Sequence, residues 1–339
     1  MTRFLLVGNP TAQSGKNEQR IHRARKAFED AGAACDFLPT QPEGRTIPAV
    51  RHALDHGGYD VVVSMGGDGT FREVGSAIIE SARRDEVQLA MLPTGTANDQ
   101  GRSFGLSSSS SAIAHNVAVA LARRETRLDG GRITARDASG NTLFSSYFFD
   151  SAGWGLMARA LARRNMDRRV VERVPIVREL WRDQALYATA AIATFLESYI
   201  VSDKFAVRAT VDGAPMRLSR LSDLVVKNTR VYAGAWVLDR SSAHDDGYFE
   251  AIPFRGRRDW TSKILVDLDG NPLTEERLNL VGVQHSKPFR FQKLELRFHA
   301  PRGAAPIAAQ MDGEEVPFGS RTTVEVLPRI LRLIVPDNP

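Results

Sequence analysis

Three glycines and an aspartate stand together in Gly66-Gly67-Asp68-Gly69-Thr70, directly after an apolar segment. Glycine adopts backbone angles that other residues resist, and it lets amide N–H groups approach phosphate oxygens. The helix expected from Phe71 to Ala82 would add the positive end of its dipole. A carboxylate in a phosphate-binding loop repels its ligand unless a cation lies between them. Asp68 therefore indicates Mg²⁺ or a proton-accepting role towards an acceptor hydroxyl. A tight glycine turn with a solvent-facing Asp68 is the alternative interpretation.

A second loop of the same character follows the next apolar segment. It reads Pro93-Thr94-Gly95-Thr96-Ala97-Asn98-Asp99. Its two threonines and its asparagine offer hydrogen-bond donors beside the glycine. Asp99 has two interpretations, since it could cap the helical segment that leads to Arg102 or be a second carboxylate near the metal. The second loop makes a simple turn at Gly66–Thr70 a weaker explanation.

A third loop follows the first apolar segment of the chain. It reads Asn9-Pro10-Thr11-Ala12-Gln13-Ser14-Gly15-Lys16. This loop is only superficially similar to a P-loop, because Gly8 lies one residue too far from Gly15 and Asn17 replaces the Ser or Thr that would hold magnesium. The first strand is also not followed by a GxGxxG fingerprint, which argues against an ordinary dinucleotide dehydrogenase.

The elements that must position these loops alternate between strand-like and helix-like patterns. The expected strands cover residues 4–7, 35–38, 59–65 and 87–92, and the expected helical segments cover residues 17–31, 50–54, 71–82 and 112–123. This alternation predicts an α/β N-terminal domain with an open, mostly parallel, doubly wound sheet. Ligands of such sheets lie at the carboxyl ends of the strands, where the three loops stand.

The pattern changes at about residue 127, after which strand-like segments are separated by Asp-Gly and Gly-Gly turns. These segments include Phe144–Phe149, Phe205–Val211, Leu224–Val226, Phe289–Phe298 and Val324–Leu327. They predict a mainly antiparallel β-sandwich C-terminal domain, with a helical insertion at about Val174–Tyr199. We therefore expect an α/β domain at residues 1–126 and a β-rich domain at 127–339, whose final segment could pack back on the first domain.

Composition limits the possible classes of protein. The 339 residues are 42% hydrophobic and 25% charged, which is typical of a folded protein of about two domains. The single Cys35 excludes an internal disulfide framework and suits a reducing cytoplasm. No stretch approaches a membrane span and no signal peptide is evident, so we expect a cytoplasmic protein. The net charge of +5 selects no partner by itself.

One stretch is rich in arginine. It holds Arg159, Arg163, Arg164, Arg168, Arg169, Arg173, Arg178 and Arg182. A solvated helix face and a surface for acidic lipid headgroups are both open interpretations. The apolar segment at 174–199 is likewise either a buried helix or a wall for acyl chains.

Together the three loops resemble the diacylglycerol kinase catalytic-domain family, which includes sphingosine kinases, ceramide kinases and bacterial lipid kinases. That family shows an Asn-Pro loop, then GGDGT with a glutamate three residues on, then P-x-G-T-x-N-D. The corresponding residues here are Asn9, Pro10, Ser14, Gly15 and Lys16, then Gly66–Thr70 with Glu73, then Pro93–Arg102. GGDGT is shared with NAD kinases and phosphofructokinases, whereas the third element is highly specific.

The second half resembles the family more loosely. The matching stretches are 150–155, 228–234, 245–250 and 310–314. Asp150 stands where the family has asparagine, Met157 where an acidic residue is common, and Arg240 where a proline precedes the Asp-Asp-Gly turn. All three lie in the β-rich domain, which in this family supplies part of the acceptor site, whereas the α/β domain holds ATP. They therefore weaken the inference of the substrate more than the inference of kinase activity.

The resemblance implies a kinase that uses ATP and Mg²⁺ in a cleft between its domains. It implies ATP-binding roles for Asn9, Pro10, Ser14, Gly15, Lys16, Gly66, Gly67, Asp68, Gly69, Thr70, Glu73, Pro93, Thr94, Gly95, Thr96, Asn98 and Asp99. Asp68 would bind the metal or act as the base, and Glu314 is the other candidate base. Asp245 and Asp246 would bind a structural Mg²⁺, although an Asp-Gly turn explains them equally well. Without the resemblance, a hairpin turn would be the preferred explanation of Asp312–Glu314.

The expected acceptor is a lipid such as diacylglycerol, a ceramide or a sphingoid base, as in phospholipid biosynthesis. Peripheral contact with a membrane surface and a homodimer are further expectations from the resemblance. Two alternatives stay open: a kinase of a soluble acceptor, such as an NAD kinase, and a non-catalytic nucleotide or lipid sensor. A nucleic-acid partner is not expected, because no motif for one is present.

Overall fold

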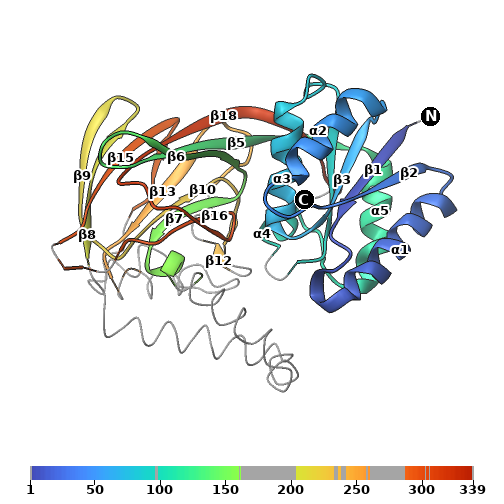
Figure 1. Cartoon of the computed structure of the whole chain (residues 1–339), viewed down its shortest axis with the longest axis horizontal. Helices are drawn as coiled ribbons and strands as arrows, with labels where there is room; N and C mark the ends of the chain where they lie inside the picture. The colour runs from blue at the N-terminus through green and yellow to red at the C-terminus, as the bar shows by residue number, and fades with distance from the viewer. Residues whose placement is uncertain are drawn as a thin grey trace, which may run out of the picture.

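The computed structural model describes residues 2–95, 98–159, 161, 204–232, 236–237, 242–256, 259, 287–301, 303–304 and 306–337. Figure 1 shows an α/β half that begins at the N-terminus and a β-rich half beside it. Among the described residues, no helix has both the length and the apolar character needed to cross a bilayer. The arginines from 163 to 182, the helical insertion at 174–199 and Arg240 lie outside the described residues.

The α/β half is the doubly wound unit that the alternating pattern predicts. Its parallel strands are β1 (Arg3–Gly8), β2 (Ala34–Pro39), β3 (Val61–Gly66) and β4 (Gln88–Pro93), in the order β2-β1-β3-β4. Helices α1 (Lys16–Asp30) and α5 (Ile113–Ala122) share one apolar cluster, and α2 (Thr46–Gly57) and α3 (Asp68–Glu80) share another. The central strands are buried on both faces, as helices on both sides of a sheet require.

Helix α3 begins three residues earlier than expected. Gly67 is its N-cap, and the Phe71 N–H donates to the Gly67 carbonyl at 3.1 Å. Asp68, Gly69 and Thr70 therefore form the first helical turn instead of a loop that precedes it. Short 3₁₀ helices lie at η1 (Ala12–Gly15) and η2 (Ser110–Ala112), and α4 (Asp99–Ser103) is a single turn.

The β-rich half contains two antiparallel sheets. One runs β6-β5-β18-β15-β8-β9, through β5 (Glu125–Arg136), β6 (Thr142–Phe148), β8 (Phe205–Val211), β9 (Ala214–Leu221), β15 (Lys293–His299) and β18 (Arg321–Ile334). The other runs β14-β13-β10-β7-β16-β17, through β7 (Ser151–Gly155), β10 (Asp223–Lys227), β13 (Phe249–Phe254), β14 (Phe289–Phe291), β16 (Ala309–Met311) and β17 (Glu314–Val316). A further pair joins β11 (Val231–Tyr232) to β12 (Trp236–Val237).

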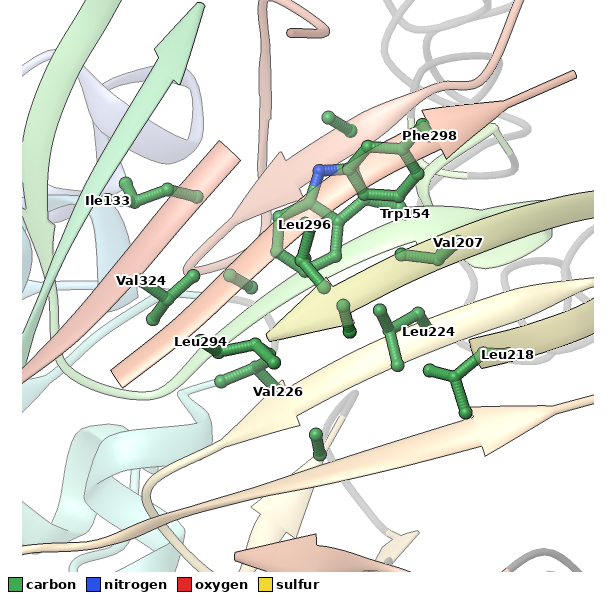
Figure 2. Packing of buried hydrophobic residues seen from close by; sticks show 14 of the residues in the cluster. Ile133, Trp154, Val207, Leu218, Leu224, Val226, Leu294, Leu296, Phe298 and Val324 are labelled. Carbon is green, nitrogen blue, oxygen red and sulfur yellow. The ribbon is translucent and has the colours of Figure 1, made fainter. Parts of the chain in front are cut away.

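The inward side chains of both sheets form one apolar core, which Figure 2 shows around Trp154, Leu224 and Leu296. Alternate residues of β15 are buried and exposed, as the two-residue period of a half-buried strand dictates. The predicted antiparallel sandwich is therefore confirmed. The expected strand Phe289–Phe298 is in fact two strands, because Asp212 accepts hydrogen bonds from the N–H groups of Gln292 and Lys293 at the break.

Strand β18 belongs to both halves. Its first residues pair with β15, whereas Arg332 and Leu333 near its end pair in parallel with Gln88 and Leu89 of β4. Figure 1 shows this strand, in red, running from the β-rich half into the α/β half. One sheet of ten strands is therefore continuous through the molecule. The domain boundary at residues 126 and 127 stays a prediction.

Candidate functional site

The three loops named from the sequence meet at the carboxyl ends of β1, β3 and β4. In the sheet register, Gly8 is paired with Met65, and Gly66 with Pro93. The N–H groups of Thr94 and Gly95 both donate to the Gly66 carbonyl, at 2.8 and 3.2 Å. Parallel pairing therefore brings together segments that lie far apart in the sequence.

The two glycine loops touch through their backbones. A Cβ atom on Gly95 would lie 2.5 Å from the Cα of Gly67, so glycine is required at this contact. Asn98 holds the second loop in shape from a left-handed conformation, φ 53°. Its Oδ1 accepts from the Gly95 N–H at 2.8 Å, and its Nδ2 donates to the Gly95 carbonyl at 2.7 Å. Asn98, not Asp99, is the N-cap of α4, so the capping interpretation of Asp99 is wrong by one residue.

The Asp68 carboxylate joins the first turn of α3 to the second loop. Its Oδ2 accepts from the Asp99 N–H at 3.2 Å, and its Oδ1 accepts from the Gln100 N–H at 3.1 Å. Burial, with a contribution from the negative charge of Asp150, raises the pKa of Asp68 to about 7. A carboxyl group with this pKa can both take up and release a proton at neutral pH.

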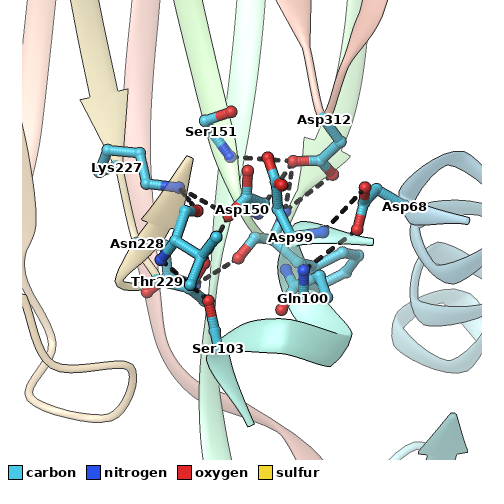
Figure 3. Close-up of polar contacts among 12 residues, drawn as sticks. Asp68, Asp99, Gln100, Ser103, Asp150, Ser151, Lys227, Asn228, Thr229 and Asp312 are labelled. Atoms are coloured by element: carbon cyan, nitrogen blue, oxygen red, sulfur yellow. Dashed lines mark hydrogen bonds and ion pairs between the residues drawn. The ribbon is translucent and has the colours of Figure 1, made fainter. Parts of the chain in front are cut away.

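The β-rich half places two further carboxylates beside Asp68, and Figure 3 shows the group. Asp312 is buried at the turn between β16 and β17, and its carboxylate accepts from the N–H groups of Phe149, Asp150 and Ser151 at 2.8 to 3.3 Å. Burial, followed by the charge of Asp150, raises the pKa of Asp312 to about 7. This carboxylate fixes the chain around residue 150 in the site.

A buried lysine balances the negative charge of Asp150. Lys227 Nζ lies 2.7 Å from Asp150 Oδ1, and the two side chains are 1% and 2% exposed. Lys227 also donates to the Val231 carbonyl at 2.7 Å and lies over the ring of Tyr232. Thr229 donates its hydroxyl hydrogen to the same oxygen of Asp150. The departure from the family's asparagine at position 150 thus comes with a cation that balances it.

Glu314 reaches the site from the hairpin of β16 and β17. Its carboxylate lies against Gly69, where a Cβ atom would collide with it, and it forms an ion pair with Arg72 of α3. The Glu314 side chain is 53% exposed, in contrast to Asp68 and Asp312. Asp312 and Gly313 form the turn of this hairpin, so the hairpin interpretation of the segment is correct, and Glu314 still contacts α3.

The other predicted residues are distributed unevenly. The Asn9 carbonyl accepts from Asn17 Nδ2 at 2.7 Å, and Arg20 of α1 donates to the Thr94 carbonyl at 3.3 Å, which ties the first loop to the second. Glu73 is directed elsewhere and forms a hydrogen bond with Thr46 of α2; burial raises its pKa. The side chains of Ser14 and Lys16, and the whole of Thr96, lie outside the described part of the chain.

Arg290 of β14 lies beside the Asp245–Gly247 turn and supplies a positive charge to it. Arg290 forms ion pairs with Asp246 and, at 3.3 Å, with the buried Glu250 that faces it across the β13–β14 pair. In the described ranges, no group of three His, Cys, Asp or Glu residues could hold a metal ion. The structural metal at Asp245 and Asp246 stays a prediction.

Sequence reasoning did not assign Lys227 and Asp312 to the site. Lys227 follows three apolar residues, Leu224–Val226, at the end of β10, and a charged residue that closes a buried strand was the available signal. Asp312 stands in an Asp-Gly turn, and nothing local distinguishes a buried turn from an exposed one.

Comparison with known proteins connects these loops to one family. Residues 3–133 match the family model described as diacylglycerol kinase catalytic domain. A diacylglycerol kinase of Staphylococcus aureus (strain MRSA252) is 29% identical over 134 residues, which are 40% of this chain and 41% of that protein. A probable lipid kinase YegS-like of Klebsiella pneumoniae (strain 342) is 30% identical over 119 residues, 35% of this chain and 38% of that protein. The chain thus matches about two fifths of the length of these curated relatives.

Solved structures are similar over the whole chain in fold alone. A diacylglycerol kinase from Bacillus anthracis str. Sterne superposes with a TM-score of 0.69 at 16% identity, covering 99% of this chain and 97% of that one. Yeast NADH kinase, solved with NADH, superposes with a TM-score of 0.51 at 9% identity, covering 99% and 84%. The α/β unit followed by an antiparallel β-rich unit is therefore confirmed. The resemblance predicted from the three loops is also confirmed, since residues 3–133 match the model of the diacylglycerol kinase catalytic domain.

Proposed function

We propose that this protein is an ATP- and Mg²⁺-dependent kinase that transfers the γ-phosphoryl group to a hydroxyl of a lipid. The observation that carries the proposal is the position of Asp68. Its half-buried carboxylate accepts from the N–H groups of Asp99 and Gln100, directly after the second glycine loop, beside Asp150 and Asp312 of the β-rich half. The glycine-loop backbone, which suits phosphate, therefore lies next to carboxylates that suit proton transfer. The names of the relatives, diacylglycerol kinase and probable lipid kinase, support a lipid acceptor.

Asp68 is the better candidate for the base. In the proposed step, the acceptor hydroxyl gives its proton to the Asp68 carboxylate, its oxygen bonds to the γ-phosphorus, and the bond to ADP breaks. A pKa of about 7 suits this exchange at neutral pH. Glu314 is half exposed and paired with Arg72, so we assign it to orienting the acceptor beside Gly69.

The carboxylates at this site fit Mg²⁺ that arrives with ATP. Magnesium in kinases is commonly held by one or two carboxylates together with substrate phosphates, and Asp99, next to the base Asp68, would supply one of them. When bound, the ion would neutralise charge that develops on the transferred phosphoryl group.

The decisive experiment is incubation with labelled ATP and Mg²⁺ against a panel of lipids, with NAD as the soluble acceptor. We expect a lipid to be labelled, and Asp68→Asn to lower the rate by at least about 100-fold, the low end for loss of a general base. Asp36→Asn, at an exposed carboxylate on β2, is the matched control and should keep the wild-type rate. Labelling of NAD alone would establish the soluble-acceptor alternative, and ATP binding without any transfer would establish the sensor.

A further inference from the structure

Five arginines stand in one row across the outer face of the large sheet. Sheet register pairs Arg217 with Arg208, Arg208 with Arg297, Arg297 with Arg321, and Arg321 with Arg136. They come from five successive strands, β9, β8, β15, β18 and β5. Neighbouring strands lie about 4.8 Å apart, so this arginine row is about 19 Å long.

The arginine row faces solvent. On each strand the residues beside the arginine point inward; Val207 and Ala209 flank Arg208, and Leu296 and Phe298 flank Arg297, all in the sandwich core. Arg208, Arg217, Arg297 and Arg321 are exposed, and Arg136 is half-buried. The row therefore follows from the two-residue period of the strands.

The arginine row has no acidic partner among the described residues. Within the part of the chain that the structure describes, none of the five side chains has an ion pair or a hydrogen bond. The one acidic side chain in the adjacent row, Glu295, pairs with Lys293 at 3.3 Å. Like charges directly opposite each other destabilise a sheet, so five in a row cost stability unless an anion binds there.

A second row on the same face shows ordinary compensation. Register places Lys293, Glu325 and Arg132 side by side on β15, β18 and β5. Arg132 lies 2.7 Å from Glu325, and Lys293 lies 3.8 Å from it. This compensated row lies on three of the same strands and on the same face, but each of its basic residues has an acidic partner. The two rows therefore form a matched pair.

We propose that the arginine row binds the anionic headgroups of a phospholipid bilayer and docks the protein on the membrane. This inference rests on the proposed lipid acceptor, which would lie in a bilayer. A broad sheet face with evenly spaced guanidinium groups suits a planar array of phosphates. Single-stranded nucleic acid is less well matched, because the outward row on one side contains Thr210, Glu295 and Thr323, which offer no ring for base stacking, and Glu295 would repel a phosphate backbone. On the other side, His299 supplies a ring beside Arg297.

The test compares two double variants with the same change in net charge. Arg208→Gln with Arg297→Gln removes the centre of the arginine row, and Lys293→Gln with Arg132→Gln removes the basic residues of the compensated row. Sedimentation with vesicles of phosphatidylglycerol in phosphatidylcholine measures binding, and phosphatidylcholine vesicles give the uncharged reference. We expect the first variant to bind about 30-fold more weakly, from about fivefold per basic residue, and the second to bind nearly as the wild type does. Added salt should weaken wild-type binding.

Equal losses in both variants would mean general charge attraction and would overturn the proposal. The proposal would also fail if the wild-type protein did not bind the anionic vesicles. Binding of an RNA oligonucleotide through the arginine row, in place of the vesicles, would likewise overturn it. Because relief of like-charge contacts should leave stability unchanged or raised, a lowered unfolding midpoint in the first variant would contradict the argument as well. Kinase activity measured on a lipid in uncharged detergent micelles separates this inference from the proposed function. That activity should survive loss of the arginine row, and its absence from the wild type would count against the function alone.

Discussion

Lys227 and Asp150 form a buried ion pair whose disruption should be costly. We predict that Lys227→Met lowers the free energy of unfolding by about 3–5 kcal/mol, because it leaves the Asp150 carboxylate buried without a counter-charge. Urea unfolding measures the change. Adding Asp150→Asn, the amide typical of the family, should recover most of the loss. Lys26→Met, which breaks an exposed pair with Asp30, is the control and should leave the free energy of unfolding nearly unchanged.

Stability should also depend on pH through Asp68 and Asp312. Each has a pKa raised to about 7 in the folded protein, so each binds a proton more tightly when folded than when unfolded. Their contribution is fully present below the unfolded pKa of about 4 and is lost as the pH rises towards about 7. We predict that unfolding free energy falls over this window, by at most about 1.4 kcal/mol per pH unit for each group.

Asp68→Asn tests this pH dependence without metal or nucleotide. The variant lacks one of the two titrating carboxyl groups, so its unfolding free energy should change less steeply between about pH 5 and pH 7 than that of the wild type. An unchanged slope would show that Asp68 titrates alike in both states.

At the scale of residues, the sequence predicted the site where spacing is local. Asp68 and the two glycine loops follow strands directly, so a strand pattern is enough to bring them together. Lys227 was missed because its partner Asp150 is distant in the sequence, and a lysine at the end of a strand usually extends into water. The close backbone approach of Gly67 to Gly95 could not be predicted either, because it depends on the register of two strands.

At the scale of an element, the charges around the Asp245–Gly247 turn before β13 predict how the protein responds to metal ions. Arg290 of β14 pairs with Asp246 and Glu250, so positive charge is already present there. We predict that, without nucleotide, neither Mg²⁺ nor EDTA moves the thermal midpoint of the wild type. Arg290→Met should lower the midpoint, because the buried Glu250 loses its cation, and added Mg²⁺ should then raise it. A wild-type midpoint that falls on chelation would instead establish the metal expected from the family resemblance.

Element types followed from periodicity, but element ends did not. Helix α3 starts at Asp68 because Gly67 caps it, although the glycines suggested a longer loop. The break at Gln292 depends on Asp212, which lies in a different hairpin. Boundaries are set by such distant hydrogen bonds, whereas a strand's alternation is visible within its own residues.

At the scale of the molecule, the sequence predicted two halves but not the strand that joins them. The sequence suggested that the final segment could pack back on the first domain, but it did not indicate which strand the segment would pair with. The pairing of Leu333 with Leu89 is a contact between residues far apart in the chain, and an apolar run alone does not name its partner. The length of β18 has a thermodynamic consequence, because one strand contributes Val324 to the sandwich core and Leu331 and Leu333 to the α/β core.

We therefore predict that the two halves unfold together. Leu333→Ala should cost about 2–5 kcal/mol, because the Leu333 side chain of β18 is fully buried in the α/β core. Trp154 lies in the sandwich core, so a change in its fluorescence reports on the β-rich half, although the substitution is in the α/β core. In urea, fluorescence and the hydrogen-exchange protection of β1 and β3 should shift to the same lower midpoint. If fluorescence instead keeps its wild-type midpoint while β1 and β3 lose protection, β18 does not couple the halves. A strand shared by two cores leads us to expect one transition, since neither core can lose β18 without the other.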